Sequence, residues 1–206
     1  MPNETAPEHL RLFLALTVPE DVKSAIERAQ KELRSAVSEG LVRWTRREQF
    51  HLTLRFLGNV DAERLQALED SARKVCAGFG PFQAWARQVS FFPERGLPRV
   101  VWVGIQDRDA RLLKLQLALQ DATLGFSSEA PEKRFTGHVT LGRIKEIRRP
   151  QAEALMSAVA SLRDRGFGEW TVSTVELMRS ELSSAGALHT TLTALPLDAA
   201  TKAPLP

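Results

Sequence analysis

The residues best suited to chemistry are two histidine–threonine pairs, one in each half of the chain. The first lies in Phe50–Gly58, which reads FHLTLRFLG, and the second in Gly137–Arg143, which reads GHVTLGR. An imidazole changes its charge near neutral pH, so it can either give or take a proton. Two imidazoles on opposite sides of a bound group can therefore act as general acid and general base. With threonine hydroxyls beside them to donate to an anion, the pairs predict acid–base chemistry on a group such as a phosphodiester.

The alternation of apolar and polar residues predicts that both motifs are β-strands. Successive side chains of a strand point to opposite faces, so each motif would bury its apolar face and present the other. The buried face of the first motif would carry Leu52, Leu54 and Phe56. The residues expected to face the substrate are His51, Thr53 and Arg55 in the first motif, and His138 and Thr140 in the second.

Other chemistries fit the sequence less well. Zinc sites usually need three or four His, Cys, Asp or Glu ligands, and the motifs supply two histidines with no carboxylate at a fixed spacing. Cys76 is the only cysteine, and the chain has neither a Gly-rich loop ending in Gly-Lys-Ser/Thr nor a Gly-x-Ser-x-Gly elbow. We therefore expect no metal and no cofactor.

Two further histidines are expected to lie outside the site. His189 begins a third His-x-Thr-Leu sequence, but neither Gly nor Arg follows it, and the predicted final strand contains it. His9 lies in the polar N-terminal segment and is given no role. Both are interpreted as structural or surface residues.

Composition indicates a globular protein. The chain has 206 residues, of which 43% are hydrophobic and 26% charged, and no run approaches the roughly 20 apolar residues of a membrane span. The polar first residues do not resemble a secretory signal. We expect a cytoplasmic monomer with no membrane contact. The pI of about 9.3 and basic pairs near both motifs favour a phosphate-bearing partner; these pairs are Arg46–Arg47, Lys133–Arg134 and Arg148–Arg149.

The order of predicted elements repeats, because helix, motif strand, helix and hairpin occur twice. We predict an α+β, antiparallel, duplicated and bilobal fold, in which two sheets face a central cleft with helices on the outside. Residues 10–198 would form one domain of two pseudo-symmetric lobes, with a flexible N-terminus over 1–9 and a disordered tail over 199–206. The late hairpin is predicted to pair Trp170–Arg179 with Leu188–Leu197.

The motifs in their context resemble the 2H phosphoesterase family, and specifically its branch of RNA 2′,3′-cyclic phosphodiesterases, also called 2′-5′ RNA ligases. The resemblance covers nearly the whole chain. It rests on these segments: Arg11–Leu16 with Pro19, Val42–Trp44, His51–Gly58, Phe135–Arg143, and Leu177–Ser180 followed by Gly186. One departure is Gly137, where many members have proline before the second histidine.

The resemblance implies that the protein hydrolyses a 2′,3′-cyclic phosphate to a 2′-phosphomonoester without metal. In that reading His51 is the general acid, His138 is the general base, and Thr53, Thr140 and Arg143 hold the phosphate. Because Arg143 is an odd number of positions from His138, a bulge or a strand end is needed to bring it to the same face. Arg55 is the alternative cation. ATP-independent 2′-5′ joining of RNA ends would be the same chemistry with an RNA hydroxyl replacing water.

The expected partner is RNA ending in a 2′,3′-cyclic phosphate, or a cyclic nucleotide. Two alternatives stay open at this point. One is the same chemistry on another cyclic-phosphate nucleotide or a 2′-5′ oligonucleotide, and the other is a non-catalytic RNA- or nucleotide-binding module. Candidates for stacking against a base are Phe50, Phe92 and Trp102.

Overall fold

The computed structural model of the protein describes residues 9–183 and 186–198, so the expectations for 1–8 and 199–206 lie outside the described residues. Four helices are present in this part: α1 (Glu20–Ser35), α2 (Leu65–Cys76), α3 (Arg111–Ala122) and α4 (Arg149–Ala160). The strands are β1 (His9–Thr17), β2 (Val42–Trp44), β3 (His51–Asp61), β4 (Phe82–Phe92), β5 (Val100–Gln106), β6 (His138–Ile144), β7 (Gly166–Val172), β8 (Thr174–Ser183) and β9 (Gly186–Pro196).

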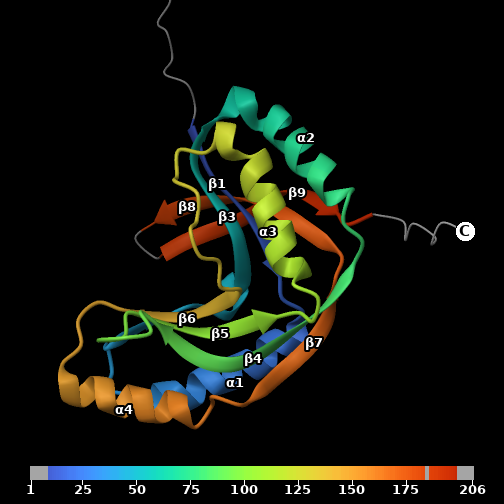
Figure 1. Cartoon of the computed structure of the whole chain (residues 1–206). Helices are drawn as coiled ribbons and strands as arrows, with labels where there is room; N and C mark the ends of the chain where they lie inside the picture. The colour runs from blue at the N-terminus through green and yellow to red at the C-terminus, as the bar shows by residue number, and fades with distance from the viewer. Residues whose placement is uncertain (1–8, 184–185, 199–206) are drawn as a thin grey trace, which may run out of the picture.

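The strands form one curled antiparallel sheet with two halves (Figure 1). Their order is β7-β4-β5-β6-β3-β1-β8-β9, and β2 adds to β6 at the side. The two motif strands, β3 and β6, meet in the middle through the single residue pair Leu52–Val139. Helices α2 and α3 cover one half and α1 and α4 cover the other (Figure 1). The predicted α+β, duplicated, antiparallel fold is confirmed, and the two predicted sheets are joined at this one point.

Each half of the sheet is built from both halves of the chain. Helix α1 follows β1 in sequence but packs against β7, in the other half. Near its C-terminus the chain returns to the half that contains β1, at the connection between β7 and β8. The Leu197 amide donates to the Ser173 carbonyl at this connection. The prediction of one strand over Trp170–Arg179 was therefore wrong. Val172 and Val175 are both buried, so the apolar pattern runs through the crossing without a Gly or Pro to mark it.

The core lies between the sheet and its helices. Helix α1 buries one apolar stripe, since Val22, Ile26, Ala29 and Leu33 are at most 1% exposed. One polar residue of α1 is also buried: the Gln30 side-chain amide donates to the Leu141 carbonyl at 2.9 Å and to the Thr45 carbonyl at 2.8 Å. Because buried polar groups are costly unless they are paired, this contact ties α1 firmly to β6.

Strand β1 begins at His9, the last residue of the segment that was expected to be flexible. Its imidazole Nδ1 lies 2.9 Å from the Asp61 carboxylate, across the β1–β3 pair. In the part of the chain that the structure describes, no helix has the length and apolar character to cross a membrane.

Candidate active site

A β-bulge follows the threonine of each motif. In β3 the pairing with β1 skips Leu54, and in β6 the pairing with β5 skips Leu141. A bulge puts one extra residue into a strand, so the residues after it change face. Arg143 therefore joins His138 and Thr140, and of the two routes that its spacing allowed, a bulge or a strand end, the structure has the bulge. In the first motif, the same change puts Phe56 on the face of His51 and Thr53, and Arg55 on the opposite one.

The two motif strands line one cavity of about 510 Å³. Five residues expected at the site are brought together here: His51, Thr53, His138, Thr140 and Arg143. The sequence analysis assigned no role to the rest of the lining, which is Arg11, Phe13, Arg43, Trp44, Thr45, Gln49, Phe56, Ser180, Ala187 and His189.

Both motif imidazoles are held in the same tautomer. Nδ1 of His51 lies 2.7 Å from the Gln49 carbonyl oxygen, and Nδ1 of His138 lies 2.7 Å from the Thr136 carbonyl oxygen. A carbonyl oxygen only accepts, so each Nδ1 carries the hydrogen and each neutral ring keeps its lone pair on Nε2. In β3, Nε2 of His51 lies 3.1 Å from the Thr53 hydroxyl, which can donate to it. The site thus presents two imidazoles whose Nε2 lone pairs can take a proton, and that of His51 lies beside the Thr53 hydroxyl.

Burial favours the neutral form of both rings. The pKa of His51 is lowered to about 4, first by burial and then by the neighbouring His189 and His138, while its bond to the Gln49 carbonyl acts in the opposite direction. Burial also lowers the pKa of His138, with a smaller contribution from Arg143. Near neutral pH the site therefore holds two neutral imidazoles among several arginines.

Each motif histidine packs against aromatic rings. The His51 ring centroid is 5.1 Å from that of Phe13, and the His138 centroid is 5.2 Å from that of Phe92. Trp102 stacks behind Phe92, with 4.9 Å between ring centroids. Of the three residues expected to stack on a base, Phe92 and Trp102 thus support His138, and Phe50 is only 2% exposed in the core. Stacking by Phe50 was a wrong expectation, because a phenylalanine preceding a strand gives no sign of which way its ring turns.

The arginines at the cavity are not those of the basic pairs. Arg43 and Arg143 are cross-strand partners on β2 and β6, and Arg11 comes from β1. Arg47, by contrast, binds the Glu20 carboxylate at 2.8 Å on the helix side. Lys133 and Arg134 are not among the residues that line the cavity. Proximity in sequence to the motifs therefore did not predict which basic residues line the cavity, because short connections carry those pairs away from the strand face.

Arg55 is not among the residues that line the cavity of the two histidines, although it lines an adjoining cavity of about 280 Å³ with Thr53 and His138. It is 3% exposed, and its guanidinium donates to the Ala130 carbonyl, the Glu129 carbonyl and the Ser127 hydroxyl at 2.7–2.9 Å. The expectation that it shares the face of His51 was wrong because the bulge at Leu54 intervenes. Arg55 instead anchors the loop that leads into β6.

His189 lies inside the cavity, contrary to its expected place outside the site. Its ring stands edge-on to that of His51, with 5.0 Å between centroids, and is equally close to Phe13. The Nδ1 atom of His189 is buried and has no hydrogen-bond partner among the described residues. No pattern in the sequence marked this contact, because it depends on how the β8–β9 hairpin docks beside β1.

Close packing explains why residue 137 is glycine where many family members have proline. A Cβ atom there would lie 2.6 Å from the Ile105 carbonyl oxygen and 2.8 Å from a methyl group of Leu112. The Gly137 carbonyl also accepts a hydrogen bond from the Ile105 amide at 2.8 Å. Glycine thus lets β6 enter the sheet close to β5 and set the position of His138.

Among the described residues, no three His, Cys, Asp or Glu side chains are grouped as metal ligands would be. The donors at the cavity are imidazoles, hydroxyls and guanidinium groups, and this set suits an anion.

Comparison with known proteins places this geometry in a family. Residues 16–102 and 103–189 each match the family model described as LigT like phosphoesterase. The chain is 32% identical over 182 residues to a Methanothermobacter thermautotrophicus protein named RNA 2′,3′-cyclic phosphodiesterase, covering 88% of this chain and 95% of that one. An Archaeoglobus fulgidus protein of the same name is also 32% identical, with coverage of 87% and 96%.

Solved structures show the same fold. The crystal structure of the Thermus thermophilus protein TT0787 superposes with a TM-score of 0.76 at 28% identity, covering 92% of this chain and 99% of that one. The structure of E. coli LigT complexed with 3′-AMP gives a TM-score of 0.71 at 22% identity, with coverage of 92% and 99%.

Proposed function

The chain belongs to the LigT-like phosphoesterase family, and from that premise we propose that it is an RNA 2′,3′-cyclic phosphodiesterase. The observation that carries the proposal is the pair of matched imidazoles in one cavity. Each donates its Nδ1 hydrogen to the carbonyl two residues earlier and leaves Nε2 for substrate. Proteins of this name cover most of the chain at about one-third identity.

In the proposed reaction, His138 is the general base and His51 the general acid. Nε2 of His138 takes a proton from water as the water oxygen bonds to phosphorus. The bond from phosphorus to the 3′ oxygen breaks, and protonated His51 gives its Nε2 proton to that oxygen. The products are a 2′-phosphomonoester and a free 3′ hydroxyl. His51 ends neutral and His138 ends protonated, so one proton transfer through solvent resets the pair.

The charge of the substrate explains how His51 comes to carry its proton. The protein alone favours neutral rings, since burial lowers the pKa of both. A cyclic phosphate brings one negative charge between them, and a nearby opposite charge favours the imidazolium form. Binding of the substrate thus raises the pKa of His51 from about 4 and supplies the acid only when it is needed.

The phosphate oxygens are assigned to Thr53, Thr140 and Arg143. The two hydroxyls sit on the same strand faces as the two histidines, one on each side of the cavity. Arg143 adds a planar cation that can donate two parallel hydrogen bonds to a phosphate. If an RNA hydroxyl replaces water, the same groups join RNA ends through a 2′-5′ bond without ATP.

The test is incubation with a 2′,3′-cyclic phosphate in excess EDTA, with the 2′- and 3′-phosphate products resolved. The proposal expects the 2′-phosphate alone and no effect of EDTA. A 3′-phosphate product would contradict the assignment of the leaving oxygen, and loss of turnover in EDTA would contradict the metal-free mechanism. Binding without turnover by the intact protein would favour the non-catalytic module.

A further inference from the structure

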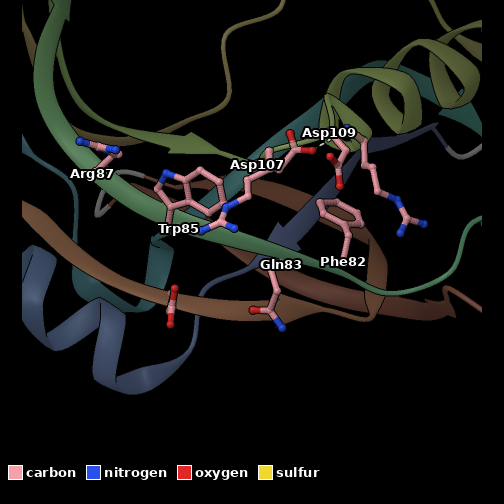
Figure 2. A pocket seen from close by; sticks show the side chains of 9 residues that line it. Phe82, Gln83, Trp85, Arg87, Asp107 and Asp109 are labelled. Carbon is pink, nitrogen blue, oxygen red and sulfur yellow. Dashed lines mark hydrogen bonds between the residues drawn. The ribbon is translucent and has the colours of Figure 1, made fainter.

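A second pocket, separate from the site described above, opens at the N-terminal end of β4 (Figure 2). Its volume is about 630 Å³. The lining combines aromatic, basic and acidic side chains: Phe82, Gln83, Trp85, Arg87, Asp107, Arg108, Asp109, Arg111 and Glu169. Figure 2 shows Trp85 lying over β4 between Arg87 and Phe82, with Asp107 and Asp109 across from it on the chain that leads into α3.

This pocket lies on the same face of the sheet as His138. Directly opposed residues of neighbouring strands share a face, and the ladder runs from His138 to Gly104 to Arg87. Trp85 is two residues from Arg87, so it also shares that face. Two strand spacings separate His138 from Arg87, which is roughly 10 Å. Gly104 lies between them, and the Trp102 ring packs over it, 3.3 Å from where a Gly104 Cβ atom would lie, so a bound strand would cross this aromatic ring.

The pocket offers unused groups for a nucleobase and a phosphate. The Trp85 indole nitrogen is buried and finds no hydrogen-bond partner within residues 9–183 and 186–198, and the Arg108 guanidinium lies 6.0 Å from the indole centroid. The side chain of Arg87 is exposed and has no hydrogen bond or ion pair to the residues that the structure describes.

Not every charged group of the pocket is available. Asp107 accepts from the Arg111 amide at 2.6 Å at the start of α3, and the Arg111 side chain donates to the Gly80 and Pro81 carbonyls. That leaves the carboxylates of Asp109 and Glu169, which can accept from the amino groups of a base.

We propose that this pocket binds RNA next to the reacting end, with a base stacked on Trp85 and the adjoining phosphate held by Arg87. The inference rests on the proposed function, because it extends the substrate of that same site from a terminal cyclic phosphate to the strand that carries it. An indole face stacks on any base, and an exposed arginine neutralises a backbone phosphate without reading sequence. The enzyme then favours RNA ends over free cyclic nucleotides.

The experiment compares two substrates with the same terminal nucleotide. One is 2′,3′-cyclic AMP, and the other is a short single-stranded oligoribonucleotide that ends in adenosine 2′,3′-cyclic phosphate. The intact protein is expected to have a higher kcat/KM for the oligonucleotide. Trp85→Ala should lower that value by about 5- to 100-fold, the cost of one lost base-stacking contact, and should leave turnover of cyclic AMP unchanged.

Matched variants separate binding from folding. Arg87→Glu should weaken the oligonucleotide reaction and make it less sensitive to salt, because one phosphate contact is lost. Arg28→Glu makes the same charge change at an exposed position of α1, on the helix side of the sheet, and should have no such effect. Trp85→Phe keeps an aromatic face and should restore most of the preference.

Each outcome has a distinct meaning. Equal kcat/KM values for the two substrates in the intact protein would overturn the inference and leave the proposed function standing. A preference that survives both Trp85→Ala and Arg87→Glu would overturn it as well. Turnover of neither substrate by the intact protein would reject the proposed function, and this inference with it.

Discussion

The two motif strands share a scaffold and differ just after the bulge. In both, the histidine donates from Nδ1 to the carbonyl two residues earlier, and a leucine bulges after the threonine. The next two positions are Arg55 and Phe56 in β3, but Gly142 and Arg143 in β6. The repeat therefore provides two equivalent imidazoles. The strands diverge after the bulge, and only β6 carries a cation, Arg143, on the same face as its own histidine.

The neighbours of each strand explain the divergence. At Gly142 a Cβ atom would lie 2.5 Å from a methyl group of Val42, because β2 packs closely there. The Leu141 carbonyl at the bulge is held by Gln30 of α1. At the equivalent place in β3, Arg55 binds the loop of residues 127–130. One bulge is thus specialised for presenting Arg143 and the other for anchoring the connection to β6.

The largest expected effect is removal of either imidazole. His51→Ala and His138→Ala should each lower kcat by about 10²–10⁴-fold, the usual contribution of a general acid or base. His189→Phe is the control, since it keeps a ring against His51 and removes no proposed reacting group. Steady-state rates on a 2′,3′-cyclic phosphate measure the effect. A loss confined to one of the two motif histidines would contradict their equivalence.

The second largest effect is expected at Arg143, and it tests the difference between β6 and β3 after the bulge. Arg143→Ala should lower kcat/KM by about 100-fold, because a charge-assisted donor to the reacting phosphate is lost. Phe56→Ala, at the equivalent position of β3, should act mainly on KM, since the 51% exposed ring can contact substrate but carries no charge. Similar losses of kcat/KM in Arg143→Ala and Phe56→Ala would contradict the claim that only β6 supplies a charged donor to the phosphate.

Substitutions of Arg55 and of Gly142 should lower the free energy of unfolding. Arg55→Met should cost about 1.5–3 kcal/mol, because carbonyl groups of residues 129 and 130 lose a charged donor. Gly142→Ala should cost about 1–3 kcal/mol through overpacking against Val42. Denaturant unfolding measures both. An unchanged free energy of unfolding in Arg55→Met would show that this arginine is not the anchor of the loop.

The pH dependence should show the smallest effect, a displaced optimum. Catalysis needs one ring protonated and the other neutral, and burial lowers the pKa of both. The singly protonated pair is therefore most populated below the ordinary histidine pKa of about 6.5. The optimum of kcat/KM, which reports the free enzyme, should lie below that value, and that of kcat should lie higher because bound phosphate favours the proton. An optimum of kcat/KM above neutrality would contradict this electrostatic account.

Much of the architecture could be predicted because it follows from periodicity. The alternation around His51 and His138 identified both strands, and their repetition indicated a duplicated fold. The bulges could not be read from pattern, since Leu54 and Leu141 suit either a regular strand or a bulged one. Only the resemblance, which implied a role for Arg143, called for a bulge or a strand end in β6, and nothing called for either in β3. Contacts from distant strands, such as His189, depend on docking that local sequence does not encode.

The central claim is that the two equivalent imidazoles take opposite roles, and a changed leaving group tests it directly. In a 2′,3′-cyclic phosphate with sulfur in place of the bridging 3′ oxygen, the departing thiolate needs little protonation, since thiols have a pKa of about 8.5. We predict that His51→Ala recovers most of its lost activity on this substrate while His138→Ala does not. Recovery by His138→Ala alone, or equal loss in both variants, would contradict the assignment of acid and base.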